Sequence, residues 1–426
     1  MTTHDERCTP VGVSDVSGVS DVADVADIAD IAADLGELSD WQRELRAHFP
    51  IVTGSPGLAY LDSAATSQKP QAVLDTVQRY LTTANANAGR GTYTWANATT
   101  ALVERTRARV ARFLGDPAPL ERSGVHFTSG ATEGLRTVAR DWLPHHLRDG
   151  DEIIVPFADH QANALPWLEA RDLLAERGVR VTVRELPYEE ASHDYDPAAL
   201  AGLVTERTAF LAATHVHHVY GGDMNVHRLR AAVGPRVPIC LDAAQSVGHL
   251  PVDVGALDVD FLVFSGHKAM ALPGTGAVWA RNLRGPEFRP GGWSGTPNTC
   301  GIASLEAALD WLEAAGTDRI RRWIVALAAR LTEGLRGAEA YEVLGCQQSL
   351  AGDTEVQRRE GIVTFRHRAI GSNDLGFVLA SHGLMVRADG HCQGRAGESE
   401  SSVRVSLHVY NTPEEIDRLL AVLLTL

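Results

Sequence analysis

A lysine follows a short apolar segment near the middle of the sequence. Residues 261–264 are Phe-Leu-Val-Phe, and Ser-Gly-His then leads to Lys268. Four consecutive apolar residues are typical of a strand that is buried on both faces of a sheet. A lysine at the end of such a strand loses water, which lowers the pKa of its amine and allows it to attack a carbonyl. Taken alone, a surface lysine just past the strand is the simpler interpretation.

A second apolar segment upstream weakens that simpler interpretation. Ile-Cys-Leu at residues 239–241 runs into Asp242, which is followed by Ala-Ala-Gln245. An acid at one strand end and a lysine at the next fit neighbouring units of an α/β sheet. A site for pyridoxal phosphate (PLP) needs this pair, a lysine for the Schiff base and an aspartate for the pyridinium nitrogen. The two strand ends together therefore predict a PLP site.

The composition is that of an ordinary globular protein. The chain has 426 residues, of which 44% are apolar and 22% charged, enough for one large or two medium domains. The formal net charge of −15 argues against a nucleic acid partner. We find neither an apolar run long enough to span a membrane nor a signal-peptide core, so we expect a cytoplasmic protein. The cysteines are scattered without a C-x-x-C pair, which argues against a disulfide framework and a zinc site: Cys8, Cys240, Cys300, Cys346 and Cys392.

Strands and helices alternate from residue 151 onward, which predicts a mainly parallel sheet with helices on both faces. Ligands bind beyond the carboxyl ends of such strands, where His160, His215–His218, Asp242 and Lys268 fall. The predicted strands are 58–62, 152–156, 179–185, 209–214, 239–242, 261–264 and 276–280, and in a smaller C-terminal α+β region 362–366 and 403–407. The predicted helices are 71–81, 96–114, 135–142, 162–177, 197–205, 226–233, 302–315, 320–335, 373–381 and 413–426.

The first 36 residues are low in complexity, with Val or Ile at every third position between Val16 and Ile31 and aspartates in step. A period of three supports neither a helix face nor a strand, so we expect a mostly disordered acidic leader with some helix near 28–35. The expected division is a leader at 1–36, a large domain at 37–300 and a small domain at 301–426. A Gly/Ser/Thr-rich turn at 128–134 offers N–H groups to a phosphate, with simple helix capping as the alternative.

The ordered motifs resemble those of the class-V aminotransferases of PLP fold-type I, and among them the cysteine desulfurases of the SufS/selenocysteine lyase branch. The resemblance runs from about Asp40 to the C-terminus. It implies a large domain with a mainly parallel seven-stranded sheet between helices, a smaller C-terminal α+β domain and a homodimer. The motifs that carry it are residues 60–70, 132–134, 159–167, 242–245, 265–268, 295–299 and 404–411.

The resemblance also implies roles for individual residues. Lys268 would hold PLP and act as the base at Cα, Asp242 would keep the ring nitrogen protonated, and His160 would stack on the ring. Arg404 would bind the substrate carboxylate in a two-pronged geometry that lysine cannot supply. The other implied cofactor contacts are Ala131, Thr132, His218, Gln245, Ser265, His267 and, across a dimer, Thr296. The other implied substrate contacts are Ala65, His218 and Arg387, and no metal is implied.

Cys392 stands where the resemblance places a nucleophilic cysteine that attacks the sulfur of the substrate. We expect His391, Arg387 and Arg395 to lower the pKa of its thiol, and the Gly/Ser-rich run that follows to form a mobile loop that delivers sulfur. An incidental loop cysteine is the alternative. The arginine expected to bind substrate, Arg404, lies close downstream and favours the functional interpretation.

Three positions depart from the family pattern. His218 replaces an asparagine, Gly89 replaces a histidine, and the segment 288–295 is shorter than the hairpin that the family extends toward the partner's site. The leading hypothesis is a PLP-dependent cysteine desulfurase that converts L-cysteine to L-alanine, with a persulfide on Cys392 for a sulfur acceptor such as iron–sulfur cluster assembly uses. The alternatives are a C–S or C–Se β-lyase, a transaminase or epimerase of specialised metabolism, and a catalytically silent binding scaffold.

Overall fold

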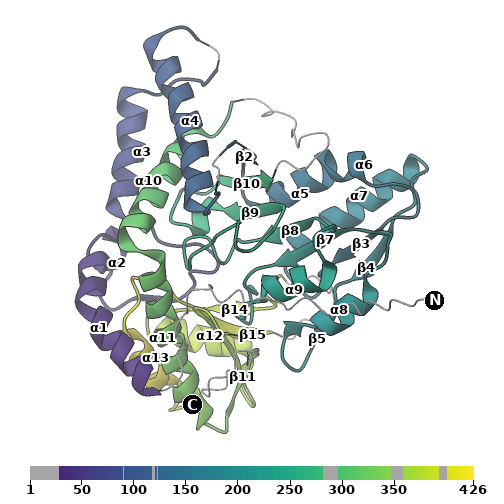
Figure 1. The fold of residues 1–426 in the computed structure, drawn as a ribbon. Helices are drawn as coiled ribbons and strands as arrows, with labels where there is room; N and C mark the ends of the chain where they lie inside the picture. The colour runs from purple at the N-terminus through teal and green to yellow at the C-terminus, as the bar shows by residue number, and fades with distance from the viewer. Residues whose placement is uncertain are drawn as a thin grey trace, which may run out of the picture.

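The computed structural model describes residues 28–89, 91–117, 120–121, 123–281, 296–346, 358–392 and 401–426. Two sheets organise this part of the chain, a large one among helices and a small one near the C-terminal helix (Figure 1). Within the described ranges no helix is long and apolar enough to cross a membrane.

The large sheet has seven strands in the described part of the chain, in the order β2-β10-β9-β8-β7-β3-β4. Strands β9, β8, β7, β3 and β4 are parallel neighbours, whereas β10 is antiparallel to both β9 and β2. The prediction of a mainly parallel sheet is therefore confirmed. The bounds are β2 (Ser123–Thr128), β3 (Glu152–Val155), β4 (Thr182–Glu185), β7 (Thr208–Thr214), β8 (Ile239–Asp242), β9 (Phe261–Ser265) and β10 (Gly276–Arg281).

Both faces of this sheet are buried, which explains the continuous apolar runs in its strands. Along β9, Phe261 and Val263 belong to one core cluster, and Leu262 and Phe264 to the other, because successive side chains of a strand point to opposite faces. Helices α5, α6 and α7 cover one face and α8 and α9 the other (Figure 1). Their bounds are α5 (Ala131–Asp141), α6 (Leu143–His146), α7 (Leu165–Glu176), α8 (Pro197–Leu203) and α9 (Val226–Val233).

The small sheet is antiparallel throughout, in the order β11-β12-β15-β14, and confirms the predicted C-terminal α+β arrangement. Short pairs accompany it: β1 runs parallel to β13, and β5 and β6 form a hairpin. The strand bounds are β1 (Ala59–Tyr60), β5 (Tyr188–Glu189), β6 (Asp194–Tyr195), β11 (Tyr341–Leu344), β12 (Ile362–His367), β13 (Leu384–Met385), β14 (Arg387–Asp389) and β15 (Ser402–Ser406). The remaining helices are α1 (Ile28–Arg46), α2 (Pro50–Thr53), α3 (Gln71–Thr83), α4 (Thr94–Phe113), α10 (Thr299–Ala315), α11 (Thr317–Arg336), α12 (Ser372–Ser381) and α13 (Pro413–Leu423).

Two expected boundaries fall inside helices. Helix α1 begins at Ile28 and continues through residue 36, and its Leu35 and Leu38 are buried while Asp34 pairs with Arg322 of α11. The predicted leader thus overlaps α1 at 28–36, where some helix was expected, and residues 1–27 lie outside the described ranges. Helix α10 likewise begins before residue 301 and packs against α3 and α4 (Figure 1).

Candidate active site

A cavity of about 260 Å³ lies where the carboxyl ends of β7, β8 and β9 face strands β14 and β15. Thr214, Asp242 and Ser265 line it as the last residues of the three parallel strands. This is the place where ligands bind in sheets of this kind. The predicted cofactor and substrate residues that line the cavity are Ala65, Ala131, Thr132, His160, His218, Asp242, Gln245, Ser265, His267, Lys268, Arg387 and Arg404.

Asp242 is buried and Lys268 is half-buried on the wall of this cavity. Burial lowers the pKa of Lys268 to about 8, although the neighbouring carboxylate of Asp242 acts in the opposite direction. Burial raises the pKa of Asp242, and a hydrogen bond of 2.9 Å from the Ala244 N–H to Oδ1 partly offsets this. An amine with such a pKa is partly neutral near physiological pH, so Lys268 can act as a nucleophile or as a base.

The backbone before Lys268 is held by a polar loop that follows β1. The carbonyl oxygen of His267 accepts hydrogen bonds from the N–H and hydroxyl of Ser67 at 3.0 and 3.1 Å, and from Thr66 Oγ1 and Lys69 Nζ at 3.1 Å each. Burial lowers the pKa of Lys69 to about 8. The loop belongs to the sequence motif at 60–70, but the sequence does not reveal these supporting bonds, because they go to a backbone oxygen.

Other predicted cofactor residues already have partners within the protein. His160 Nδ1 accepts from the Ala162 N–H at 3.1 Å, and burial lowers the pKa of His160 to about 4, which keeps the ring neutral. Ser265 Oγ accepts from the N–H of Ala131, the first residue of α5, at 2.8 Å. Gln245 Nε2 donates to the Ala64 carbonyl at 3.1 Å. These bonds orient the imidazole ring of His160, the N-terminus of α5 and the side-chain amide of Gln245 around the cavity.

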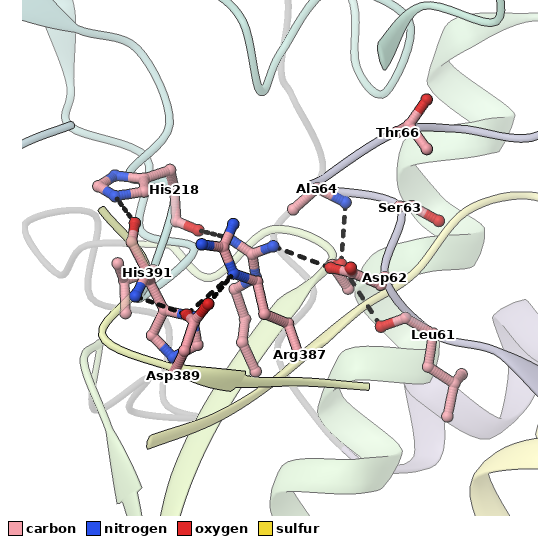
Figure 2. Close-up of polar contacts among 12 residues, drawn as sticks. Leu61, Asp62, Ser63, Ala64, Thr66, His218, Arg387, Asp389 and His391 are labelled. Carbon is pink, nitrogen blue, oxygen red and sulfur yellow. Dashed lines mark hydrogen bonds and ion pairs between the residues drawn. The ribbon is translucent and has the colours of Figure 1, made fainter. Parts of the chain in front are cut away.

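Arg404 is almost fully buried, with 1% of its surface exposed, and it contacts Asp62 and His218, both labelled in Figure 2. Its Nη2 donates to Asp62 Oδ1 at 2.9 Å and its Nη1 to the carbonyl of His218 at 3.0 Å. Arg387 of β14 lies directly opposite it in the small sheet. Asp62 was not predicted as a site residue, although it holds the arginine expected to bind substrate.

Cys392 lies in an exposed turn beside the cavity, and its Sγ accepts a hydrogen bond from Arg387 Nη2 at 3.3 Å. The expectation that His391 also acts on the thiol is wrong. His391 Nε2 lies 2.9 Å from Ser402 Oγ and its Nδ1 3.1 Å from Asp389, and burial lowers the pKa of His391 to about 4, so it carries no charge. Arg395 and the predicted mobile run lie outside the described residues.

His218 is buried, and its Nε2 lies 2.9 Å from the carbonyl oxygen of His391 (Figure 2). Its ring meets the ring of His160 edge-on, with centroids 5.0 Å apart. Burial holds the pKa of His218 well below its usual value, so the ring is neutral.

Two further predicted positions lie elsewhere. Thr296 is exposed and accepts from Asn87 Nδ2 at 3.4 Å rather than lining the cavity of its own chain. Gly89 has φ 72°, a left-handed conformation that a histidine adopts only at a cost, so glycine suits the observed turn. The shortened segment 288–295 lies outside the described residues.

A family model described as Aminotransferase class-V matches residues 59–419. The chain belongs to this family. It is 33% identical to the cysteine desulfurase of Cronobacter sakazakii, covering 89% of this chain and 96% of that protein. It is 35% identical to the cysteine desulfurase of Pectobacterium carotovorum, covering 88% of this chain and 96% of that protein.

Solved structures agree with this membership in the class-V aminotransferase family. A cysteine desulfurase from Thermococcus onnurineus superimposes with a TM-score of 0.78 at 26% identity, over 90% of this chain and 97% of the other. The cysteine desulfurase CsdA of Escherichia coli gives a TM-score of 0.74 at 28% identity, over 90% of this chain and 97% of the other. The predicted fold-type I architecture is thus confirmed.

The residues around the cavity fit PLP by their chemistry. A half-buried lysine with a lowered pKa, Lys268, and a buried carboxylate, Asp242, share the wall. The first turn of helix α5, with Ala131 and Thr132, and the hydroxyl of Ser265 also line it, and these are groups that suit a phosphate. The polar groups that line the cavity therefore suit both the pyridine ring and the phosphate of PLP.

Proposed function

We propose that this protein is a PLP-dependent cysteine desulfurase. The observation that carries the proposal is that Lys268 and Asp242 share one cavity with Arg404, while Cys392 is bound to Arg387 on the wall of the same cavity. A lysine and an aspartate alone would fit many PLP enzymes. The thiol beside Arg387, at the edge of the same cavity, is the additional group that a sulfur transfer requires.

Each group of the site has a role that its surroundings support. PLP, when bound, withdraws electrons from the substrate carbon next to its amino group. Asp242 would pair with the ring nitrogen, His160 would stack on the ring, and Lys268 would move the proton at Cα. Arg404 would bind the substrate carboxylate through charge-assisted hydrogen bonds, held in place by Asp62 and the His218 carbonyl.

The proposed sulfur transfer balances without a further reactant. The Cys392 thiolate forms a bond to the substrate sulfur, the bond between that sulfur and Cβ breaks, and its electrons stay on carbon. Protons at Cα and Cβ complete alanine, and Cys392 keeps the sulfur as a persulfide. Arg387, 3.3 Å from Sγ, supplies a positive charge beside the attacking thiolate.

Three wider statements belong to the same proposal. The persulfide would pass to an acceptor protein or thiol, which suits a cysteine in an exposed turn. A homodimer would place the exposed Thr296 of one subunit at the phosphate of the other. We also propose a cytoplasmic location, where cysteine and acceptor proteins are present.

Product analysis of the holoprotein tests the proposal. Cysteine, selenocysteine, cysteine sulfinate and cystine are supplied in turn, and the amino acid or keto acid formed is identified. We expect alanine from cysteine in wild type. Pyruvate would instead identify a β-lyase, and another keto acid would identify a transaminase. An absence of cofactor absorbance would favour the binding scaffold.

A further inference from the structure

The two peptide carbonyls that flank Cys392 are both bound by residues near the strand ends of the large sheet. The carbonyl oxygen of His391 lies 2.9 Å from His218 Nε2. The carbonyl oxygen of Cys392 accepts from the Gln161 N–H at 3.2 Å. The thiol is therefore attached to the rest of the site on both sides through its own backbone.

The turn that carries the thiol is strained. His391 and Cys392 have φ angles of 54° and 59°, left-handed values that non-glycine residues rarely adopt in succession. Such conformations persist only where the surrounding contacts impose them. Within the small domain, the His391 N–H donates to Asp389 Oδ1 at 2.7 Å, and the bonds to His218 and Gln161 provide the restraint from the large sheet.

His218 is suited to this restraint by its burial and by its protonation. Because Nε2 faces a carbonyl oxygen, it must carry the ring proton, so Nδ1 is an acceptor. Nδ1 is buried and has no hydrogen-bond partner among the described residues. In this tautomer the ring has no second N–H for a cofactor hydroxyl, and its donor is committed to the turn.

The same residue also contacts the substrate arginine. The carbonyl of His218 accepts from Arg404 Nη1 at 3.0 Å, while its ring faces the His391 carbonyl, as Figure 2 shows. His218 thus connects Arg404, which is expected to bind the substrate carboxylate, to the peptide group that precedes Cys392. A substitution of the His218 side chain keeps the bond to Arg404, which uses the backbone carbonyl, and removes the bond to the His391 carbonyl.

We propose that the imidazole of His218 and the backbone N–H of Gln161 form a clamp that fixes the strained turn of Cys392 for sulfur transfer. Both are positioning residues. The clamp goes beyond the proposed desulfurase function, but its expected effect on kcat rests on that function. Loss of either bond should allow the turn to relax and misplace the thiol. A misplacement of about 1 Å can reduce a rate by about 10²-fold.

The first test compares His218→Leu with His218→Gln in the holoenzyme. Leu fills similar volume without a donor, whereas the Gln amide can donate at about the reach of the imidazole. For Leu we expect kcat to fall about tenfold or more, with the KM for cysteine within about twofold, because the carbonyl that holds Arg404 remains. Gln should recover part of kcat.

The second test removes the other bond from outside the cavity. Gln161 is exposed and is the first residue of a short 3-10 helix, a position where proline is tolerated. The preceding His160 has φ −62° and ψ 132°, the extended conformation that a following proline requires. Gln161→Pro therefore deletes the N–H and puts the ring Cδ against the Cys392 carbonyl, so it opens this side of the clamp. Gln161→Ala, which keeps the N–H, is the matched control.

Hydrogen–deuterium exchange of the peptide covering 389–392, measured on PLP-loaded protein without substrate, reports the clamp directly. We expect exchange to be at least about threefold faster in His218→Leu and Gln161→Pro, and at the wild-type rate in Gln161→Ala. Unchanged exchange in both variants would overturn the clamp, and faster exchange with unchanged kcat would overturn its positioning role. If wild type makes no alanine, the proposed function fails, while the exchange result still decides on the clamp.

Discussion

The two walls of the active-site cavity are built differently. On the wall formed by the large sheet, Asp242 and Lys268 follow strands buried on both faces, so core packing and strand register hold them. On the wall formed by the small sheet, Arg387 lines the cavity from an edge strand, and Cys392 lies beside it in an exposed turn; hydrogen bonds and ion pairs hold them. Proton transfer at carbon needs a fixed, dry base, whereas a thiol that passes sulfur onward must be reachable. The tightly packed wall thus carries the proton transfer of the proposed reaction, and the hydrogen-bonded side carries the sulfur transfer.

The largest expected effect comes from the packed wall. Lys268→Ala removes the amine that binds the cofactor and moves the Cα proton, and it should lower kcat by at least about 10³-fold. The protein should still fold, because the substitution removes a buried charge. Steady-state alanine formation and a thermal unfolding curve measure the two. Turnover within about tenfold of wild type would contradict the role of Lys268.

Cys392, beside the small-sheet wall, and Cys240, inside the strand that ends at Asp242, should respond in opposite ways. Cys392→Ser should lower alanine formation by at least about 10²-fold and leave the free energy of unfolding within about 0.5 kcal/mol, because its side chain is exposed. Cys240→Ser, in a strand with no exposed surface, should cost about 1–3 kcal/mol of stability by burying a hydroxyl among apolar groups. Kinetics and denaturant unfolding of both variants distinguish them. Equal loss of stability would show that the turn is as tightly packed as the sheet.

Arg404→Lys tests the hydrogen-bonded wall at its most buried point. Lysine offers a single ammonium and cannot bind Asp62, the His218 carbonyl and a substrate carboxylate with the geometry of a guanidinium. The KM for cysteine should rise about tenfold or more, with a smaller change in kcat. A KM equal to that of wild type would place carboxylate binding elsewhere.

The pH dependence of apoprotein stability measures the packing around Lys268. Its pKa is about 8 in the folded protein against a usual value of 10.5, so between these two pH values the unfolded chain binds more protons. Stability therefore rises with pH across that window, and relative to Lys268→Met the wild-type apoprotein should gain up to about 3 kcal/mol. Denaturant unfolding of both proteins at several pH values gives the difference. A constant difference would mean that the amine is solvated.

Asp62→Asn should have the smallest effect. The amide keeps an oxygen facing Arg404 but removes the negative charge that competes with a substrate carboxylate. The KM for cysteine should fall about threefold, with kcat little changed. A rise in KM would show instead that the charge of Asp62 is needed to orient the guanidinium.

The packed wall could be predicted from sequence, whereas most of the other wall could not. Apolar runs that end in Asp242 and Lys268 carry their own signal, because the strand and its polar terminus are adjacent in the chain. Asp62 contacts Arg404 across 342 positions of sequence, and the contact depends on the bridge that sets Asp62 beside Ser406. No local pattern encodes such a pairing.

The cysteine turn shows the same limit at short range. Sequence placed His391 next to the thiol, but the left-handed backbone at 391 and 392 turns its ring toward Ser402 and away from the sulfur. The helix that begins at the boundary predicted at residue 300, α10, packs on helices from the N-terminal half. Which residues pack together is decided by tertiary contacts rather than by local composition.

The most direct test of the proposed sulfur transfer is the mass of the Cys392 peptide after a single turnover. PLP-loaded protein is mixed with less than one equivalent of L-cysteine, its thiols are blocked, and the peptide is compared with the amount of alanine formed. We predict one additional sulfur atom on Cys392 for each alanine released. Alanine without added sulfur on that peptide, or pyruvate in its place, would contradict the proposal that Cys392 accepts the sulfur.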